Sequence, residues 1–151
     1  MMEDRPWLAH ALESVGIRER PGRESHPLIA EGFALVGLAG ADDDRVAWCS
    51  AWLCAIMERA GCRSTRRADA RSWLGYGEPC GPLLGAITVL WRYSRDDWRG
   101  HVGLLLHSAS DSARVLLVSG NASNAVSVGW YDRERVLGYR WPTAAELVAR
   151  A

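Results

Sequence analysis

The chain has 151 residues, of which 48% are hydrophobic and 24% charged, a composition typical of a folded globular protein. Its 18 basic side chains, all arginine, balance 18 acidic ones, so no net charge favours nucleic acid or an anionic membrane as partner. The longest apolar stretch, residues 83–91, is too short to cross a bilayer, and no signal-peptide pattern precedes it. We therefore expect one domain over residues 1–151, made in the cytoplasm without a signal peptide and without membrane insertion.

The first half of the chain has the apolar spacing of helices. Helices are predicted over residues 6–15, 27–38, 48–60 and 68–74. Pro6 fits the first turn of the first helix, and Gly16 and Gly61 are natural stops for the first and third. The third helix is the most apolar, and Asp44 could cap a helix that begins just after it.

The second half of the chain has the β-branched and aromatic runs of strands. Strands are predicted over residues 86–93, 101–107, 114–119, 125–130 and 136–140, followed by a short helix over residues 144–149. Helices first and an antiparallel meander second predict an α+β fold. We expect the N-terminal helices to pack on a mainly antiparallel sheet of five to six strands.

The four cysteines do not have the spacing of a zinc site, since no CxxC pair or neighbouring histidine pair occurs. Cys54, Cys62 and Cys80 are expected to be small hydrophobic residues, with a disulfide among them left open. Cys49 differs because it stands at the predicted start of the apolar third helix. The positive end of a helix lowers a thiol pKa and favours the reactive thiolate, although an inert buried thiol is the commoner role on position alone.

His101 opens a predicted strand, and the glycines on either side of residues 101–102 keep bulk away from its imidazole. If this strand packs on the third helix, His101 comes within reach of Cys49. Asn121 follows the next strand, and adjacent antiparallel strands can place it beside His101. A Cys–His pair needs such a third group to fix the imidazole tautomer. Taken singly, Asn121 is most simply a turn residue and His101 a satisfied core histidine.

The other histidines are weaker candidates for a catalytic base. His10 is expected on the surface of the first helix, and His26 is expected to cap the second. His107 ends the strand that His101 begins, roughly 20 Å away by strand rise, so it cannot serve the same thiol.

Several stretches of the chain resemble one family, in the same order. They are residues 47–52 (AWCSAW), 68–74 (ADARSWL), 98–104 (WRGHVGL), 120–127 (GNASNAVS) and 137–142 (LGYRWP). In these stretches the chain resembles the NlpC-type and CHAP-related cell-wall hydrolases of the papain-like superfamily, and within them a small subfamily common in phage and bacterial genomes. The likeness spans nearly the whole chain.

The resemblance implies a papain-like fold and hydrolysis of an amide bond in the peptide of peptidoglycan. Cys49 would be the nucleophile, His101 the base and Asn121 the orienting residue, and an acyl-enzyme would form without metal or cofactor. Peptidoglycan or its peptide fragments would be the partner, in the cell wall or periplasm. An immunity protein, a holin or a secretion machine would be a further partner if the chain is a toxin or a phage lysin.

The chain also departs from the family pattern. Ala86 stands where the family usually has Asp, Ala122 where it often has Gln, and Leu104 where Phe is usual. If that Gln contacts the substrate, specificity or activity differs here. None of these positions is one of the three proposed catalytic residues.

Residues that could contact a substrate are harder to assign from sequence. Trp48, Trp73 and Trp98 are candidate walls of a cleft, because tryptophan offers a flat apolar face and an N–H donor. The border of the cleft could include Glu19 and residues 20–23, and Arg71 or Arg99 could hold a substrate carboxylate. For each of these residues, packing or solvent exposure is the commoner role.

Two other function classes stay open from sequence alone. The first is a non-catalytic cell-wall-binding module on the same fold, against which the intact Cys49, His101 and Asn121 argue. The second is a thiol acyltransferase or deamidase that acts on a protein, since the same acyl-enzyme can meet a different acceptor.

Overall fold

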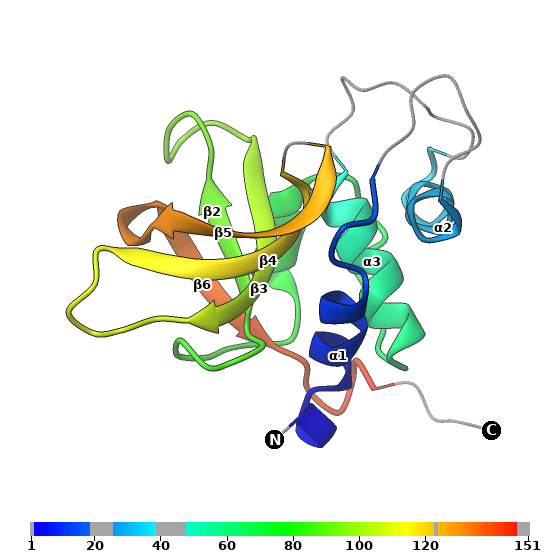
Figure 1. Cartoon of the computed structure of the whole chain (residues 1–151), viewed down its shortest axis with the longest axis horizontal. Coiled ribbons are helices and arrows are strands. Elements are labelled where there is room, and N and C mark those ends of the chain that lie inside the picture. Colours follow the sequence, from blue (N-terminus) through cyan, green and yellow to red (C-terminus); the bar gives the residue numbers. More distant parts are fainter. Residues whose placement is uncertain (1, 19–25, 39–47, 123, 148–151) are drawn as a thin grey trace.

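The computed structural model describes residues 2–18, 26–38, 48–122 and 124–147, the side chains of residues 2, 121 and 122 excepted. Figure 1 shows three α-helices gathered on one side of a twisted sheet. The α-helices are α1 (Pro6–Glu13), α2 (Pro27–Leu35) and α3 (Cys49–Arg59), with 3-10 turns η1 (Met2–Asp4), η2 (Ala70–Gly75) and η3 (Arg133–Arg135). The strands are β1 (Glu78–Pro79), β2 (Ile87–Trp91), β3 (Gly100–His107), β4 (Arg114–Ala122), β5 (Ala125–Asp132) and β6 (Val136–Trp141).

The six strands form one sheet in the order β1-β6-β2-β3-β4-β5, and every neighbouring pair is antiparallel. The predicted α+β class and antiparallel sheet are therefore confirmed. The last strand, β6, crosses back to lie between β1 and β2, so β3 occupies the middle of the sheet. This central position matters because His101 is the second residue of β3, and β3 contacts both η2 and α3.

The predicted helices agree with the structure at their glycine stops. Gly16 and Gly61 have φ values of 97° and 85°, a left-handed conformation that other residues adopt only with strain. The predicted fourth helix is a 3-10 segment, η2, rather than an α-helix. Within the described residues, none of the helices combines the length and the apolar composition needed to span a bilayer.

The helix predicted over residues 144–149 is wrong for the residues that the structure describes. Residues 144–146 form a turn, and Leu147 pairs with Cys62 as an isolated bridge. The Glu146 carboxylate accepts hydrogen bonds from the Thr143 backbone N–H at 3.0 Å and from its hydroxyl at 2.7 Å. These bonds resemble those that begin a helix, but pairing with Cys62 directs the backbone elsewhere.

The two faces of the sheet carry different cores. One face packs on α1, α2 and α3 and forms the larger cluster, which includes Val102 of β3 and Trp52 of α3. The other face holds a smaller cluster that includes Leu90, Leu105 and Leu117, against which Tyr131 packs. Because side chains alternate along a strand, Val102 and His101 leave β3 toward different faces.

The tryptophans fix α3 in place, as expected for residues in or beside the core. Trp7, Trp48, Trp52 and Trp73 are all buried. Three of them also satisfy their N–H group internally: Trp7 donates to Gly85 O at 2.8 Å, Trp52 to Ser14 Oγ at 3.0 Å and Trp73 to Ser50 Oγ at 2.9 Å. A buried indole with a satisfied N–H anchors packing in both distance and orientation.

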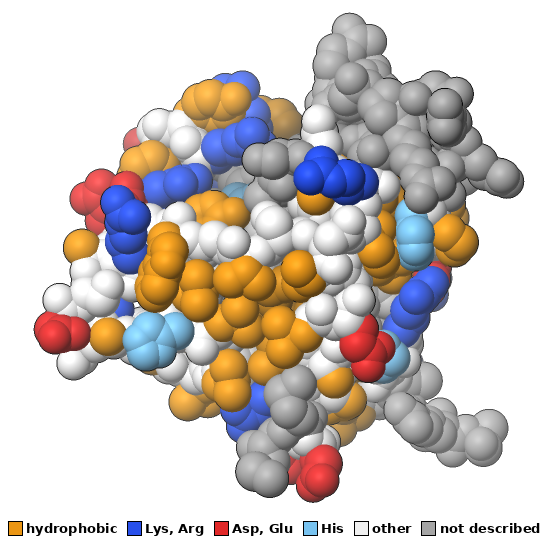
Figure 2. All heavy atoms as spheres, in the orientation of Figure 1, with side chains coloured by type: hydrophobic (Ala, Val, Ile, Leu, Met, Phe, Trp, Pro, Cys, Tyr) orange, Lys and Arg blue, Asp and Glu red, His pale blue; other side chains and the backbone are white. Residues whose placement is uncertain are grey.

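Hydrophobic side chains also reach the surface at the β5 edge of the sheet. Val126 is buried, whereas Val128 and Trp130, which follow on the same side of β5, are exposed. Figure 2 shows hydrophobic side chains gathered over the face formed by β4 and β5. The helices therefore cover only part of this face.

Candidate active site

Cys49 is the first residue of α3, as the sequence predicts, with Trp48 at the cap position. The residue is only 3% exposed, and burial raises the pKa of its thiol. Backbone N–H groups at Val102, Ser50 and Cys49 itself, together with the charge of Arg92, act in the opposite direction but do not outweigh burial. The expectation of a lowered thiol pKa is therefore wrong for this structure, because loss of water costs the thiolate more than the helix start returns.

The start of α3 is held by buried polar contacts. Ser50 is fully buried, donates its hydroxyl to Arg67 O at 2.6 Å and accepts the Trp73 N–H. Gly120 of β4 lies so close to the helix that a Cβ there would be 2.8 Å from Trp52 Cβ and 2.9 Å from the Trp48 ring. These contacts fix the position of the Cys49 sulfur against the sheet.

His101 is the second residue of β3, and its partly buried ring lies among polar and aromatic groups. Its Nε2 shares a hydrogen bond of 2.9 Å with Ser119 Oγ, and its ring stacks on Tyr131 with centroids 5.2 Å apart. Ser119 Oγ in turn lies 3.3 Å from the Tyr131 hydroxyl. The imidazole is thus held by a side chain on β4 and another on β5.

Burial lowers the pKa of His101 to about 4, with smaller contributions in the same direction from the charges of Arg92 and Arg135. The imidazole is therefore neutral at pH 7. A neutral imidazole can accept a proton, which is the state that a general base requires. With Cys49 also neutral, the resting pair is thiol and imidazole rather than thiolate and imidazolium.

The Cys49 sulfur and the His101 ring flank the same short stretch of β3 backbone. The ladder between β3 and β4 starts at Leu104↔Val118, and in the described residues it does not reach back to Val102. There the Val102 backbone faces the Cys49 sulfur instead. No hydrogen bond joins the sulfur to the imidazole among the described side chains. The two residues approach the same stretch of β3 from different faces of the sheet, Cys49 from the helix side and His101 from the side of Tyr131.

Asn121 lies near the end of β4, and its side chain is outside the described residues. If the β3–β4 register is continued by three residues, Asn121 stands opposite His101. Its orienting role stays a prediction.

Ser119 is the residue that the sequence interpretation missed. It is fully buried and makes the hydrogen bond to His101 that was expected of Asn121. The signal was Gly103, one of the two glycines expected to keep bulk away from the imidazole. A Cβ on Gly103 would be 2.9 Å from Ser119 Cβ and 2.7 Å from Val118 O, so this glycine lets Ser119 lie close to β3.

The predicted substrate contacts have different outcomes. Trp48 and Trp73 are 0% exposed and serve the core, so no substrate reaches them in this arrangement. Trp98 is 71% exposed on the turn between β2 and β3 and stays a candidate. Glu19 and residues 20–23 lie outside the described residues.

The predicted arginine contacts are already engaged within the protein. The Arg71 guanidinium donates to Arg99 O at 3.1 Å, Arg95 O at 2.7 Å and Ser94 O at 3.0 Å. Arg99 pairs with Asp97 at 2.8 Å. Both arginines therefore stabilise the turn between β2 and β3 and are poorly suited to hold a substrate carboxylate.

The remaining histidines and cysteines take structural or surface positions. His26 Nδ1 accepts the Leu28 backbone N–H at 3.1 Å, which confirms its predicted role as cap of α2. His107 is exposed and meets the edge of Trp130. The four cysteines are free thiols, so the disulfide left open among three of them is not formed.

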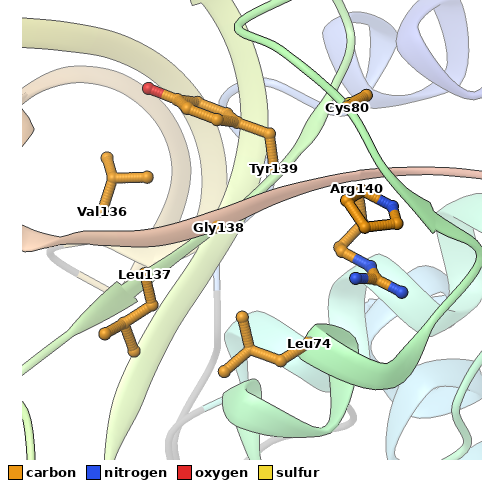
Figure 3. Close-up of a pocket in the computed structure, with 8 residues that line it drawn as sticks. Leu74, Cys80, Val136, Leu137, Gly138, Tyr139 and Arg140 are labelled. Atoms are coloured by element: carbon orange, nitrogen blue, oxygen red, sulfur yellow. The ribbon is translucent and has the colours of Figure 1, made fainter.

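A pocket away from Cys49 and His101 could hold a small molecule. This pocket of about 410 Å³ is lined mainly by apolar side chains, and Figure 3 shows Val136 and Tyr139 on one side of β6 and Leu74, Leu137 and Arg140 on the other. It includes neither Cys49 nor His101, and Arg140 donates to Tyr76 O and Gly77 O within the protein. In the described part of the chain, no three His, Cys, Asp or Glu side chains gather as metal ligands would.

Comparison of the sequence with protein-family models and with curated proteins finds no match to either. The case for a function therefore rests on the residues themselves and on the geometry around Cys49 and His101.

Proposed function

We propose that the chain is a cysteine-dependent amide hydrolase of the papain-like NlpC/CHAP type, with peptidoglycan peptide as substrate. The observation that carries the proposal is the approach of the Cys49 sulfur to the β3 backbone at Val102, the residue that follows His101, whose imidazole is neutral. A buried thiol at a helix start and a proton acceptor on the adjoining strand are the two components that thiol acyl transfer needs.

In the proposed first step, the Cys49 sulfur attacks the amide carbonyl carbon while its proton passes to His101. Since Nε2 is engaged with Ser119, Nδ1 is the ring nitrogen that accepts this proton. For that tautomer Nε2–H donates to Ser119 Oγ, whose own hydroxyl can donate to Tyr131. Because the thiol is neutral at rest, bond formation and proton transfer occur together.

The negative charge that develops on the carbonyl oxygen needs nearby donors. The backbone N–H groups of Cys49 and Ser50 at the start of α3 lie next to the sulfur and point away from the helix. Donors fixed in advance by a helix cost no reorganisation during the reaction. They would bind the oxyanion of the tetrahedral intermediate.

The second half of the cycle releases the products. The C–N bond breaks as His101 returns its proton to the departing amine, which leaves a thioester on Cys49. Water then attacks the thioester carbonyl while His101 accepts a proton from it. Cleavage of the C–S bond gives a free carboxylic acid and restores the thiol, so one water is consumed for each amide cut.

The test is cleavage of purified peptidoglycan by the wild type and by Cys49→Ala, with fragments identified by mass spectrometry. Cys54→Ala is the matched control, since Cys54 is a fully buried thiol of the same helix. We expect new amine and carboxyl ends with the wild type and with Cys54→Ala, and none with Cys49→Ala. Fragment masses also identify the bond. No new ends with the wild type would overturn the proposal and favour a binding module or a different acyl acceptor.

A further inference from the structure

Two arginines near His101 form no ion pair with a carboxylate among the residues that the structure describes. Leu90 of β2 pairs with His101, and Arg92 follows two residues later, directly after β2 ends at Trp91. Arg92 is exposed, and its guanidinium lies 6.0 Å from the Tyr93 ring centroid. Its charge reaches both Cys49 and His101.

Arg135 approaches the same place from the turn before β6. Its Nε donates to Trp91 O at 3.0 Å, which anchors the guanidinium at the end of β2. The group also lies 5.9 Å from the ring centroids of Trp91 and Tyr131. Tyr131 is the ring that stacks on His101, so Arg135 is one aromatic side chain away from the imidazole.

Several other described arginines are engaged by partners within the protein. Arg59, Arg66, Arg67 and Arg99 each form an ion pair with a carboxylate. Arg71 is engaged with three carbonyl groups. Among the described residues, no carboxylate pairs with Arg92 or Arg135, although both lie where they disfavour a protonated His101. A positive charge beside a base is best explained by a negative charge that arrives with the ligand.

We propose that Arg92 and Arg135 form a carboxylate-binding subsite next to His101, which holds an anionic peptide substrate by a carboxylate close to the bond that is cut. This inference rests on the proposed function and deepens it, because it names the charge that the substrate must carry. Arg135, anchored through Nε, presents its outer nitrogens to the carboxylate, and exposed Arg92 closes on the other oxygen.

Binding is measured in the Cys49→Ala background, so that turnover cannot interfere. The probes are a soluble peptidoglycan stem tetrapeptide with free carboxylates and the same peptide with its carboxylates amidated, titrated by calorimetry. We expect Arg135→Gln and Arg92→Gln each to weaken binding of the free acid by about tenfold. Binding of the amidated peptide should be weak from the start and should not change with either variant.

Two further variants separate charge from structure. Arg114→Gln removes an exposed arginine at the start of β4 and should leave binding unchanged. Arg135→Lys keeps the charge but loses the planar fork, so it should bind the free acid between wild type and Arg135→Gln. Equal binding of free and amidated peptide, or equal loss with Arg114→Gln, would overturn the subsite.

The same measurements distinguish failure of the subsite from failure of the proposed hydrolysis. If binding of the free acid depends on the arginines but the wild type cleaves nothing, the subsite is supported and the proposed hydrolysis is overturned. If the free and the amidated peptide are cleaved at the same rate, the proposed hydrolysis is supported and the subsite is overturned.

Discussion

The two sides of the sheet at the start of β3 differ sharply in chemistry. On the α3 side, Cys49 belongs to a cluster of tryptophan and aliphatic side chains, and backbone N–H groups approach its sulfur. On the other side, His101 lies against Ser119 and Tyr131, with two arginines nearby. Both groups stay neutral. The Cys49 thiol does so because burial excludes water, and the His101 imidazole does so because positive charge adds to the effect of burial. In the proposed hydrolysis, attack would therefore need proton transfer at the same time and would not start from a preformed ion pair.

The largest effect is expected from a change on the α3 side. Gly120→Ala places a Cβ within 3 Å of both Trp48 and Trp52, and this overpacking should cost about 3 kcal/mol of unfolding free energy. The displaced Trp48 would shift Cys49, so cleavage should fall as well. Denaturant unfolding measures the first effect. Gly129→Ala is the control, because its nearest neighbour is 3.7 Å away; equal loss in both variants would contradict the packing argument.

A pH titration of stability tests the side of the sheet that carries His101. The pKa of His101 is 6.5 in the unfolded chain and about 4 in the folded chain. Between these two pH values the unfolded chain therefore binds a proton that the folded chain does not. Stability should therefore fall as the pH drops from 6.5 to 4, by at most about 3 kcal/mol from this residue. His101→Gln should remove that part of the slope in unfolding free energy. If the unfolding free energies of the wild type and of His101→Gln change with pH in the same way, the fold does not hold His101 neutral.

The smallest effect is expected from the hydrogen bond between His101 and Ser119. Ser119→Ala should lower kcat by about tenfold with KM unchanged, since a fully buried hydroxyl can orient the imidazole but cannot touch the substrate. Tyr131→Phe keeps the stacked ring and loses only a longer contact of 3.3 Å, so its effect on kcat should be smaller. A rise in KM with constant kcat in Ser119→Ala would assign Ser119 to binding instead.

Local sequence patterns predicted most of the elements and the order in which the candidate groups occur. The start of α3 at Cys49, the strand that begins beside His101 and the glycine stops at Gly16 and Gly61 were all predictable. These features depend on local apolar spacing and on backbone conformations that favour glycine. Local signals failed near Leu147, where pairing with the distant Cys62 replaced the predicted helix, and in the predicted fourth helix, which is the 3-10 segment η2.

The electrostatic state of the site and the identity of the group that holds His101 depend on tertiary contacts. A helix start predicts a lowered thiol pKa, but packing around Cys49 reverses the direction because desolvation outweighs the backbone N–H groups. Ser119 meets His101 only because the β3–β4 register and Gly103 bring their backbones close. Arg92 and Arg135 are far apart in the chain and share one place through the sheet. Contacts between distant residues set burial and charge, and local sequence does not record them.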